Sequence, residues 1–189
     1  MAVTLSEHEN AERILREGWR LFQQKGFRGV TIDELCLTCG LTKPTLYYYF
    51  HDKENLFVQI LVRRLQGFRE VIEQPGPWEK QLEQIAAAIL DSFQTEYSVL
   101  MHDMEHIKDP ANQQRVSQAF RSELLDPMVK LMERGIREEI LATNDPRFLA
   151  QAYMSMINGF IARMGGFSDN SSELANRLAR FFLEGAKTA

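Results

Sequence analysis

Apolar residues recur at the spacing of an α-helix along nearly all of the 189 residues, and no segment shows the alternation of a strand. In the first such segment, Ile14, Leu21 and Phe22 share one stripe while charged residues occupy the opposite side. Gly26 and Gly40 stand where helix ends need a left-handed residue. The pattern predicts an all-α fold of about nine helices.

Capping residues and breakers place the helices along the chain. Thr31 and Thr42 are expected N-caps, and Pro44 fits the first turn of the helix that Thr42 begins. Long helices are expected to begin at Asp52, and the predicted helix over 111–140 should kink at Pro127. The other expected helices cover residues 7–25, 78–97, 98–108, 145–165 and 171–187. The change from short to long helices predicts one domain over 1–52 and a second over 53–189.

The overall charge argues against a strongly basic surface. The net charge is −4 at pH 7, so binding to nucleic acid would need a local site. The charged N-terminus lacks the apolar core of a signal peptide, and the longest uncharged segment, residues 148–162, is shorter than the roughly 20 residues of a membrane span. With two cysteines in addition, we expect a cytoplasmic protein with no membrane contact.

The segment between Gly26 and Phe57 holds the strongest functional signal. It contains a short helix, a glycine turn and a second short helix, which together predict a helix-turn-helix. The second helix of such a unit fits the DNA major groove, which is about 12 Å wide.

The same segment resembles the signature of the TetR family of transcriptional regulators. The matching residues, all in register, are Gly26-Phe27, Thr31-Ile32, Leu35, Gly40-Leu41, Thr45-Leu46-Tyr47, Phe50, Lys53 and Leu56. The resemblance is close over about 50 residues and extends further only in helix order and length. It implies an N-terminal three-helix DNA-binding domain, a C-terminal domain for ligand binding and dimerisation, and a homodimer on palindromic double-stranded operator DNA.

The resemblance also implies which residues contact DNA. Lys43 would donate to guanine, and Tyr47 and Lys53 would contact phosphates. Tyr48, Tyr49 and His51 border this surface and have a solvated or packing role as their alternative, while Leu35, Leu41, Leu46 and Phe50 are expected in the core. The residues expected to contact DNA are Thr31, Thr42, Lys43, Pro44, Thr45, Tyr47, Tyr48, His51 and Lys53. Because residues 1–50 carry six basic and six acidic side chains, the salt dependence should be shallow.

Two further pairs of residues have both a plain and a functional interpretation. Cys36 and Cys39 form a CxxC without further zinc ligands at suitable spacing, so they predict buried packing residues, with a thiol sensor as the alternative. His102 and His106 would share a helix face, where a polar or pocket-lining role competes with a ligand contact or a metal site.

Methionines and aromatic residues are concentrated between residues 97 and 167. Such flexible, polarisable side chains suit a cavity for an apolar ligand, although core packing explains any one of them. The residues expected to line an effector pocket are Tyr97, Met101, His102, Met104, His106, Phe120, Met128, Met132, Tyr153, Met156 and Phe160.

The last two predicted helices carry the argument for a dimer. A stripe of small residues on one and an apolar face on the other would meet within a monomer, or, as the resemblance implies, form a four-helix bundle with a second subunit. These residues are Ala152, Ser155, Gly159 and Ala162, then Leu174, Leu178, Phe181 and Phe182.

No pattern typical of an enzyme is present, and we expect no cofactor. The sequence therefore predicts a DNA-binding transcriptional regulator, and the favoured form is a repressor that an apolar or amphipathic small-molecule effector releases from DNA. A metal-responsive or redox-responsive regulator of the same fold is the alternative.

Overall fold

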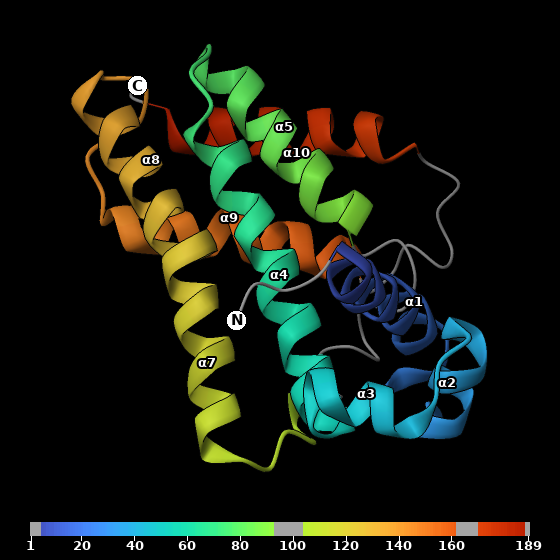
Figure 1. The fold of residues 1–189 in the computed structure, drawn as a ribbon. Coiled ribbons are helices and arrows are strands. Elements are labelled where there is room, and N and C mark those ends of the chain that lie inside the picture. Colours follow the sequence, from blue (N-terminus) through green and yellow to red (C-terminus); the bar gives the residue numbers. More distant parts are fainter. Residues whose placement is uncertain (1–4, 93–103, 162–169, 188–189) are drawn as a thin grey trace. The chain divides into compact units, whose positions relative to one another are not determined.

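The computed structural model describes residues 5–92, 104–161 and 170–187, and within these ranges every regular element is a helix (Figure 1). This confirms the predicted all-α class. Of the helix expected over 98–108, residues 104–108 are described, and after Met104 they form a turn and irregular backbone. Among the described helices, none combines the length and the apolar character needed to cross a membrane.

The observed helices follow the expected order. They are α1 (Leu5–Gly29), α2 (Ile32–Cys39), α3 (Lys43–Phe50), α4 (Lys53–Glu73), α5 (Trp78–Ser92), α7 (Pro110–Phe120), α8 (Asp126–Arg137), α9 (Pro146–Ile161) and α10 (Ser171–Ala186). A π-helical segment, Arg121–Leu125, joins α7 to α8 and ends two residues before Pro127, where a kink was predicted.

Local capping explains the short helices. The Thr31 side chain accepts a hydrogen bond from the Glu34 backbone N–H at 3.2 Å, and Thr42 caps α3 in the same way. Gly40 ends α2 with a left-handed φ of 63°, a conformation that side chains with a Cβ adopt only at a cost. The predicted caps at Thr31, Gly40 and Thr42 are confirmed, and they set the sharp turn between α2 and α3. Gly26 has a left-handed φ of 69° as expected, but it forms a kink within α1, which ends at Gly29.

The chain forms two compact units. The N-terminal unit contains the described residues up to Arg63 and the segment 104–116, and the C-terminal unit contains residues 64–92 together with the described residues from Ser117 onward. The N-terminal unit thus adds the start of α4 and the segment 104–116 to the helices expected in residues 1–52.

The core of the N-terminal unit is aromatic. The Phe57 ring lies 5.0 Å from the Phe22 ring and 5.2 Å from the Phe27 ring, measured between centroids. The predicted core residues Leu46 and Phe50 are buried on the inner side of α3, which leaves the opposite side of that helix for other contacts.

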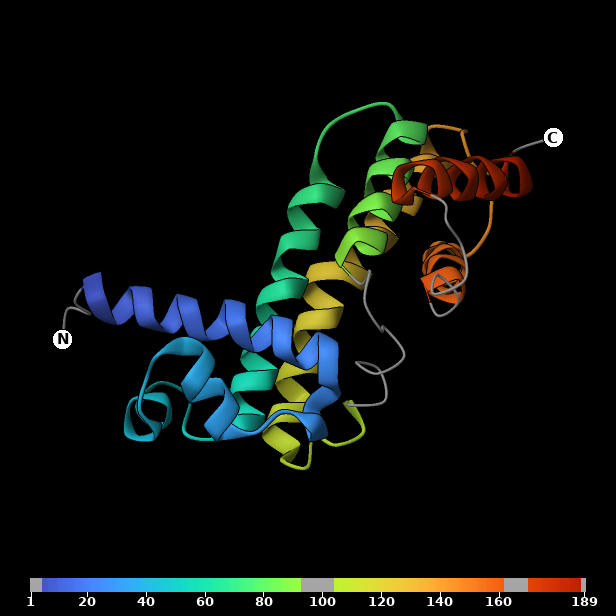
Figure 2. The same cartoon turned by 90° about the vertical axis from the view of Figure 1, so that its right-hand side faces the viewer.

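In the C-terminal unit, α10 packs mainly against α5, and Figure 2 shows α10 crossing over α5. Tyr153 of α9 is fully buried there, and its hydroxyl donates to the Leu82 carbonyl oxygen of α5 at 2.8 Å. The Tyr153 ring also lies 4.8 Å from the Phe182 ring of α10. These contacts tie three helices into one core.

Helix α8 packs closely against Trp78 at Gly135. A Cβ atom placed there would lie 2.7 Å and 2.8 Å from two carbons of the Trp78 ring, closer than van der Waals contact allows. We therefore expect Gly135→Ala to lower the free energy of unfolding by about 1–3 kcal/mol, as overpacking does. Denaturant unfolding measures this effect.

Gly67→Ala is the matched control. Gly67 is an exposed residue of α4, and a Cβ there would have no atom within 4 Å among the described residues. This change should raise the free energy of unfolding by up to about 1 kcal/mol, because alanine has a higher helix propensity than glycine. Equal effects of the two substitutions would contradict close packing at Gly135.

Candidate nucleic-acid interface

The side of α3 that faces away from the core is exposed. Tyr47 is 43% exposed and Tyr48 67%, while Leu46 and Phe50 on the other side are buried. Among the residues expected to contact DNA, those that are exposed are Thr31, Thr42, Lys43, Pro44, Tyr47, Tyr48 and His51, and those that are half-buried are Thr45 and Lys53. The first turn of α3 and one face of the helix are therefore accessible to a partner.

Lys43 is paired with an acidic residue that the sequence did not indicate. Its Nζ lies 2.7 Å from Oδ1 of Asp33, in the first turn of α2, and both side chains are well exposed. The hydrogen bond to Asp33 and the charge of that carboxylate raise the pKa of Lys43 above its usual value. Lys43 must break its ion pair with Asp33 before it can donate a hydrogen bond to a DNA base. The sequence separation of ten residues gives no helical signal for the pair.

Lys53 has a structural role in addition to the one expected from the family. Its Nζ donates hydrogen bonds of 2.8 Å to the carbonyl oxygens of Phe27, in the last turn of α1, and of Val30, in the connection between α1 and α2. It also lies 4.3 Å from the centroid of the Phe27 ring. The ammonium group therefore holds this connection against the start of α4. The predicted phosphate contact stays a prediction.

The turn between α3 and α4 orients Lys53. His51 ends α3 with a φ of 61°, which is uncommon for a residue other than glycine, and its backbone N–H donates to the Tyr47 carbonyl oxygen at 2.9 Å. Asp52 then caps α4, since its Oδ1 accepts from the Asn55 backbone N–H at 2.7 Å. The predicted start of the fourth helix is confirmed.

Glu54 links α4 to the segment that leads into α7. Its carboxylate accepts hydrogen bonds from the backbone N–H groups of Lys108 and Asp109, at 3.2 and 3.0 Å, and from the Asn112 amide at 3.0 Å. Burial by itself raises the pKa of Glu54, but these hydrogen bonds outweigh it, and the pKa falls below its usual value. The stabilisation is present at neutral pH and is lost as the pH falls through this lowered pKa.

The two cysteines are buried on α2, and both are free thiols. Burial, followed by the charge of Asp33, raises the pKa of Cys36, and burial is also the main cause of the raised pKa of Cys39. Because a reactive cysteine needs an accessible thiolate, these surroundings favour the packing interpretation over a thiol sensor.

The residues expected to line an effector pocket are dispersed. Met128, Met132 and Tyr153 are fully buried in the C-terminal unit, while Phe120 and Phe160 are exposed. Met104, His106 and Met156 are half-buried, and Tyr97, Met101 and His102 lie outside the described residues. In the described part of the chain, no group of three possible ligands could hold a metal ion. The effector pocket stays a prediction.

The residues expected at a dimer interface fall into two groups. Leu174, Leu178 and Phe182 are buried within the protomer, on the side of α10 that packs against α5. Ser155, Gly159 and Phe181 are exposed, Ala152 is half-buried, and Ala162 lies outside the described ranges. Phe148, which is 58% exposed, was not among the residues expected at a dimer interface. It lies four residues before Ala152, so helical spacing alone could have added it to the stripe on α9.

Comparison with known proteins agrees with this geometry. The sequence model of the family described as "Bacterial regulatory proteins, tetR family" matches residues 14–60, which include all of α2 and α3. Residues 14–60 of the chain therefore form a DNA-binding segment of this family. The match thus covers the capped turn, the exposed side of α3 and the carbonyl contacts of Lys53.

Individual relatives extend the likeness beyond the matched segment. The HTH-type transcriptional repressor BepR of Brucella suis is 24% identical over 165 residues, which are 81% of this chain and 79% of BepR. Among solved structures, the TetR family regulator PfmR of Thermus thermophilus has a TM-score of 0.76 at 22% identity, over 93% of this chain and 100% of PfmR.

A third protein, AibR, was solved in complex with isovaleryl coenzyme A and operator DNA. It has a TM-score of 0.72 at 16% identity, over 91% of this chain and 97% of AibR. At this identity, the likenesses to PfmR and AibR show a shared fold. The family match over residues 14–60 and the repressor relatives support a DNA-binding transcriptional regulator.

Proposed function

We propose that this chain is a TetR-family repressor that binds a palindromic operator as a homodimer and leaves it when a small apolar or amphipathic molecule binds. The observation that carries the proposal is the exposed first turn of α3, held in place by the caps at Thr31, Gly40 and Thr42. A preorganised helix of this kind can enter the major groove with its N-terminal residues at the base edges. The name of the similar BepR supports repression.

The exposed residues divide by chemistry into base-reading and phosphate-contacting groups. Lys43 would donate to guanine O6 or N7, and the Pro44 ring would contact a thymine methyl group. The Tyr47 hydroxyl would donate to a phosphate, which fixes position without reading sequence. Asp33 would repel nearby phosphates and compete for Lys43, so the surface as a whole is less positive than Lys43 alone suggests.

The experiment is a selection from a random DNA library with the full-length protein, followed by titration of the best site at two salt concentrations. We expect a palindromic site, and a roughly five- to hundredfold loss of affinity for Lys43→Ala with relaxed preference at one guanine. Asp33→Asn removes the competing charge at nearly constant shape, so it should raise affinity by about three- to tenfold at low salt.

Two results would contradict this assignment. The first is the absence of an enriched site at low salt. The second is an unchanged affinity in both variants, since Lys43 and Asp33 would then lie away from the DNA.

The dimer in this proposal uses the exposed sides of α9 and α10. Phe148 and Phe181, at 58% and 72% exposed, are large apolar side chains that a protomer alone leaves in water. Gly159 and Ser155 lie on the same helix as Phe148 and are small enough to permit close approach of a second helix. An isologous contact through these faces would give the twofold symmetry that a palindrome requires.

Release from DNA requires that an effector favour a conformation with a different spacing of the two recognition helices. The link from Glu54 to residues 108–112 offers a path, because it joins the segment that follows the expected pocket residues to the start of α4. AibR, solved with isovaleryl coenzyme A and operator DNA, supports an organic effector. A compound that binds the full-length protein and leaves operator affinity unchanged is not the effector.

A further inference from the structure

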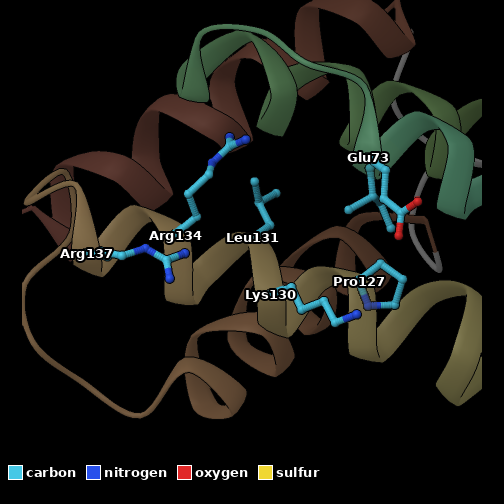
Figure 3. A pocket seen from close by; sticks show the side chains of 7 residues that line it. Glu73, Pro127, Lys130, Leu131, Arg134 and Arg137 are labelled. Carbon is cyan, nitrogen blue, oxygen red and sulfur yellow. The ribbon is translucent and has the colours of Figure 1, made fainter.

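Three cations of α8 surround a hollow in the C-terminal unit. Lys130, Arg134 and Arg137 follow one another at spacings of four and three residues, so they project from one side of the helix. The hollow has a volume of about 260 Å³, and Figure 3 shows the three side chains on α8 with Glu73 approaching from the end of α4. The remaining lining residues, Ile72, Pro127 and Leu131, are apolar.

The side chain of Arg134 is fixed by a hydrogen bond to a buried glutamine. Its guanidinium donates to the side-chain oxygen of Gln81, which is only 1% exposed, and the Gln81 amide in turn donates to the carbonyl oxygen of Gln74. Gln81 is one of two buried polar residues in the described part of the chain, so its role in fixing Arg134 accounts for its position. The arginine is thus preorganised, and binding would cost little side-chain entropy.

Two buried donors near this arginine lack an acceptor. Among the described residues, neither Arg134 Nε nor Trp78 Nε1 has a hydrogen-bond partner. Arg134 Nε lies 3.9 Å from a carboxylate oxygen of Glu138, beyond hydrogen-bond distance. The Trp78 ring packs directly on the backbone at Gly135, next to Arg134. Of these two residues, Arg134 lines the hollow, and because a buried donor without an acceptor is costly, its Nε points to an acceptor-rich ligand there.

The carboxylates around the hollow do not cancel its charge. Glu73 already pairs with Arg69 at 3.0 Å, and this pairing raises the pKa of Arg69 above its usual value. Asp126 and Glu133 line a neighbouring hollow that shares Lys130 and Pro127 with the first. The lining of the hollow therefore combines three cations with one carboxylate that has its own partner, while Glu138, outside the lining, lies 3.9 Å from Arg134.

We propose that this hollow binds the phosphate group of a small phosphorylated molecule. The guanidinium groups of Arg134 and Arg137 match a phosphate in planar, two-pronged geometry, and Lys130 adds a point charge. A phosphate carries nearly two negative charges at neutral pH, which suits three cations better than a single carboxylate would. The apolar side gives room for a carbon chain attached to the phosphate.

Isothermal titration calorimetry on the full-length protein tests this proposal without DNA, so its result does not depend on the repressor assignment. The probes are octyl phosphate, inorganic phosphate and octanol. We expect saturable binding of octyl phosphate at one site per protomer, and no comparable binding of octanol. Octyl phosphate binding more tightly than inorganic phosphate identifies an organic phosphate, and equal affinities identify free phosphate as the ligand.

The variants assign binding to these residues. Arg137→Ala changes an exposed side chain and should fold normally, and Arg134→Lys keeps the charge but loses the planar fork. Each should weaken phosphate binding at least about tenfold, whereas Arg180→Ala on the exposed side of α10 should bind as the unsubstituted chain does. Phosphate binding that is absent, or unchanged in both Arg134→Lys and Arg137→Ala, overturns the proposal. Equal binding of octanol and octyl phosphate overturns it as well.

Discussion

Gly159→Arg is expected to convert the protein into a monomer and to reduce operator affinity at least about a hundredfold. In a dimer, binding of one recognition helix raises the effective concentration of the second at the other half-site, and a monomer loses this gain. Gly159 lies on the exposed side of α9, where the proposed interface requires close approach of a second helix. An arginine there would place a charge and a long side chain between the two subunits.

The protomer itself should tolerate this change. A Cβ at Gly159 would have no atom within 4 Å among the described residues, and arginine favours a helix over glycine by up to about 1 kcal/mol. Light scattering coupled to size-exclusion chromatography gives the mass, and titration of the selected operator gives the affinity. Loss of the dimer without loss of the fold, checked by circular dichroism, assigns the effect to the interface.

Gly67→Arg is the matched control, because it makes the same substitution at an exposed glycine of α4 that also has no neighbour within 4 Å in the described structure. It should remain a dimer with normal operator affinity. If Gly159→Arg also remains a dimer, the subunits associate through another surface, and the proposed role of the α9 stripe is wrong.

Lys53→Met should lower the free energy of unfolding by about 2–3 kcal/mol, a value that allows for the partial exposure of the side chain. The substitution keeps most of the apolar stem but leaves the carbonyl oxygens of Phe27 and Val30 without their donor. For a chain of this length, such a loss corresponds to a fall of roughly 5–10 °C in the melting temperature. Thermal unfolding followed by circular dichroism measures it.

Lys43→Met separates stability from DNA contact. Lys43 is exposed and paired only with the exposed Asp33 in the described structure, so its loss should leave the melting temperature nearly unchanged while operator affinity falls. If Lys53→Met instead keeps the melting temperature and only weakens DNA binding, with a shallower salt dependence, then Lys53 acts mainly as the phosphate contact that the family resemblance implies.

The helix-turn-helix was predictable residue by residue because its determinants are local. Thr31 and Thr42 cap helices that begin at the next residue, and Gly40 supplies a left-handed φ at the end of α2. Leu46 and Phe50, four residues apart, define the buried side of α3. The exposure of Lys43 and Tyr47 was expected from the family resemblance.

The C-terminal region was less predictable, since periodicity identifies an apolar face without identifying what covers it. Leu174, Leu178 and Phe182 formed an expected dimer face, and the structure packs them inside the protomer against α5. Phe181 and Phe148 are exposed in the protomer, so they are available to contact a second subunit. Met128 and Met132, expected near a ligand, are fully buried.

The sequence by itself determined the all-α class, the order of the helices, the caps and the family to which the DNA-binding segment belongs. Each depends on residues within a few positions of one another, where backbone geometry sets the outcome. Only the tertiary structure decided that Lys53 holds carbonyl groups at the end of α1 and in the α1–α2 connection, that Asp33 pairs with Lys43, and that Gln81 fixes Arg134. These contacts join residues 10 to 53 positions apart, and such distances are set by how helices pack, which no local pattern records.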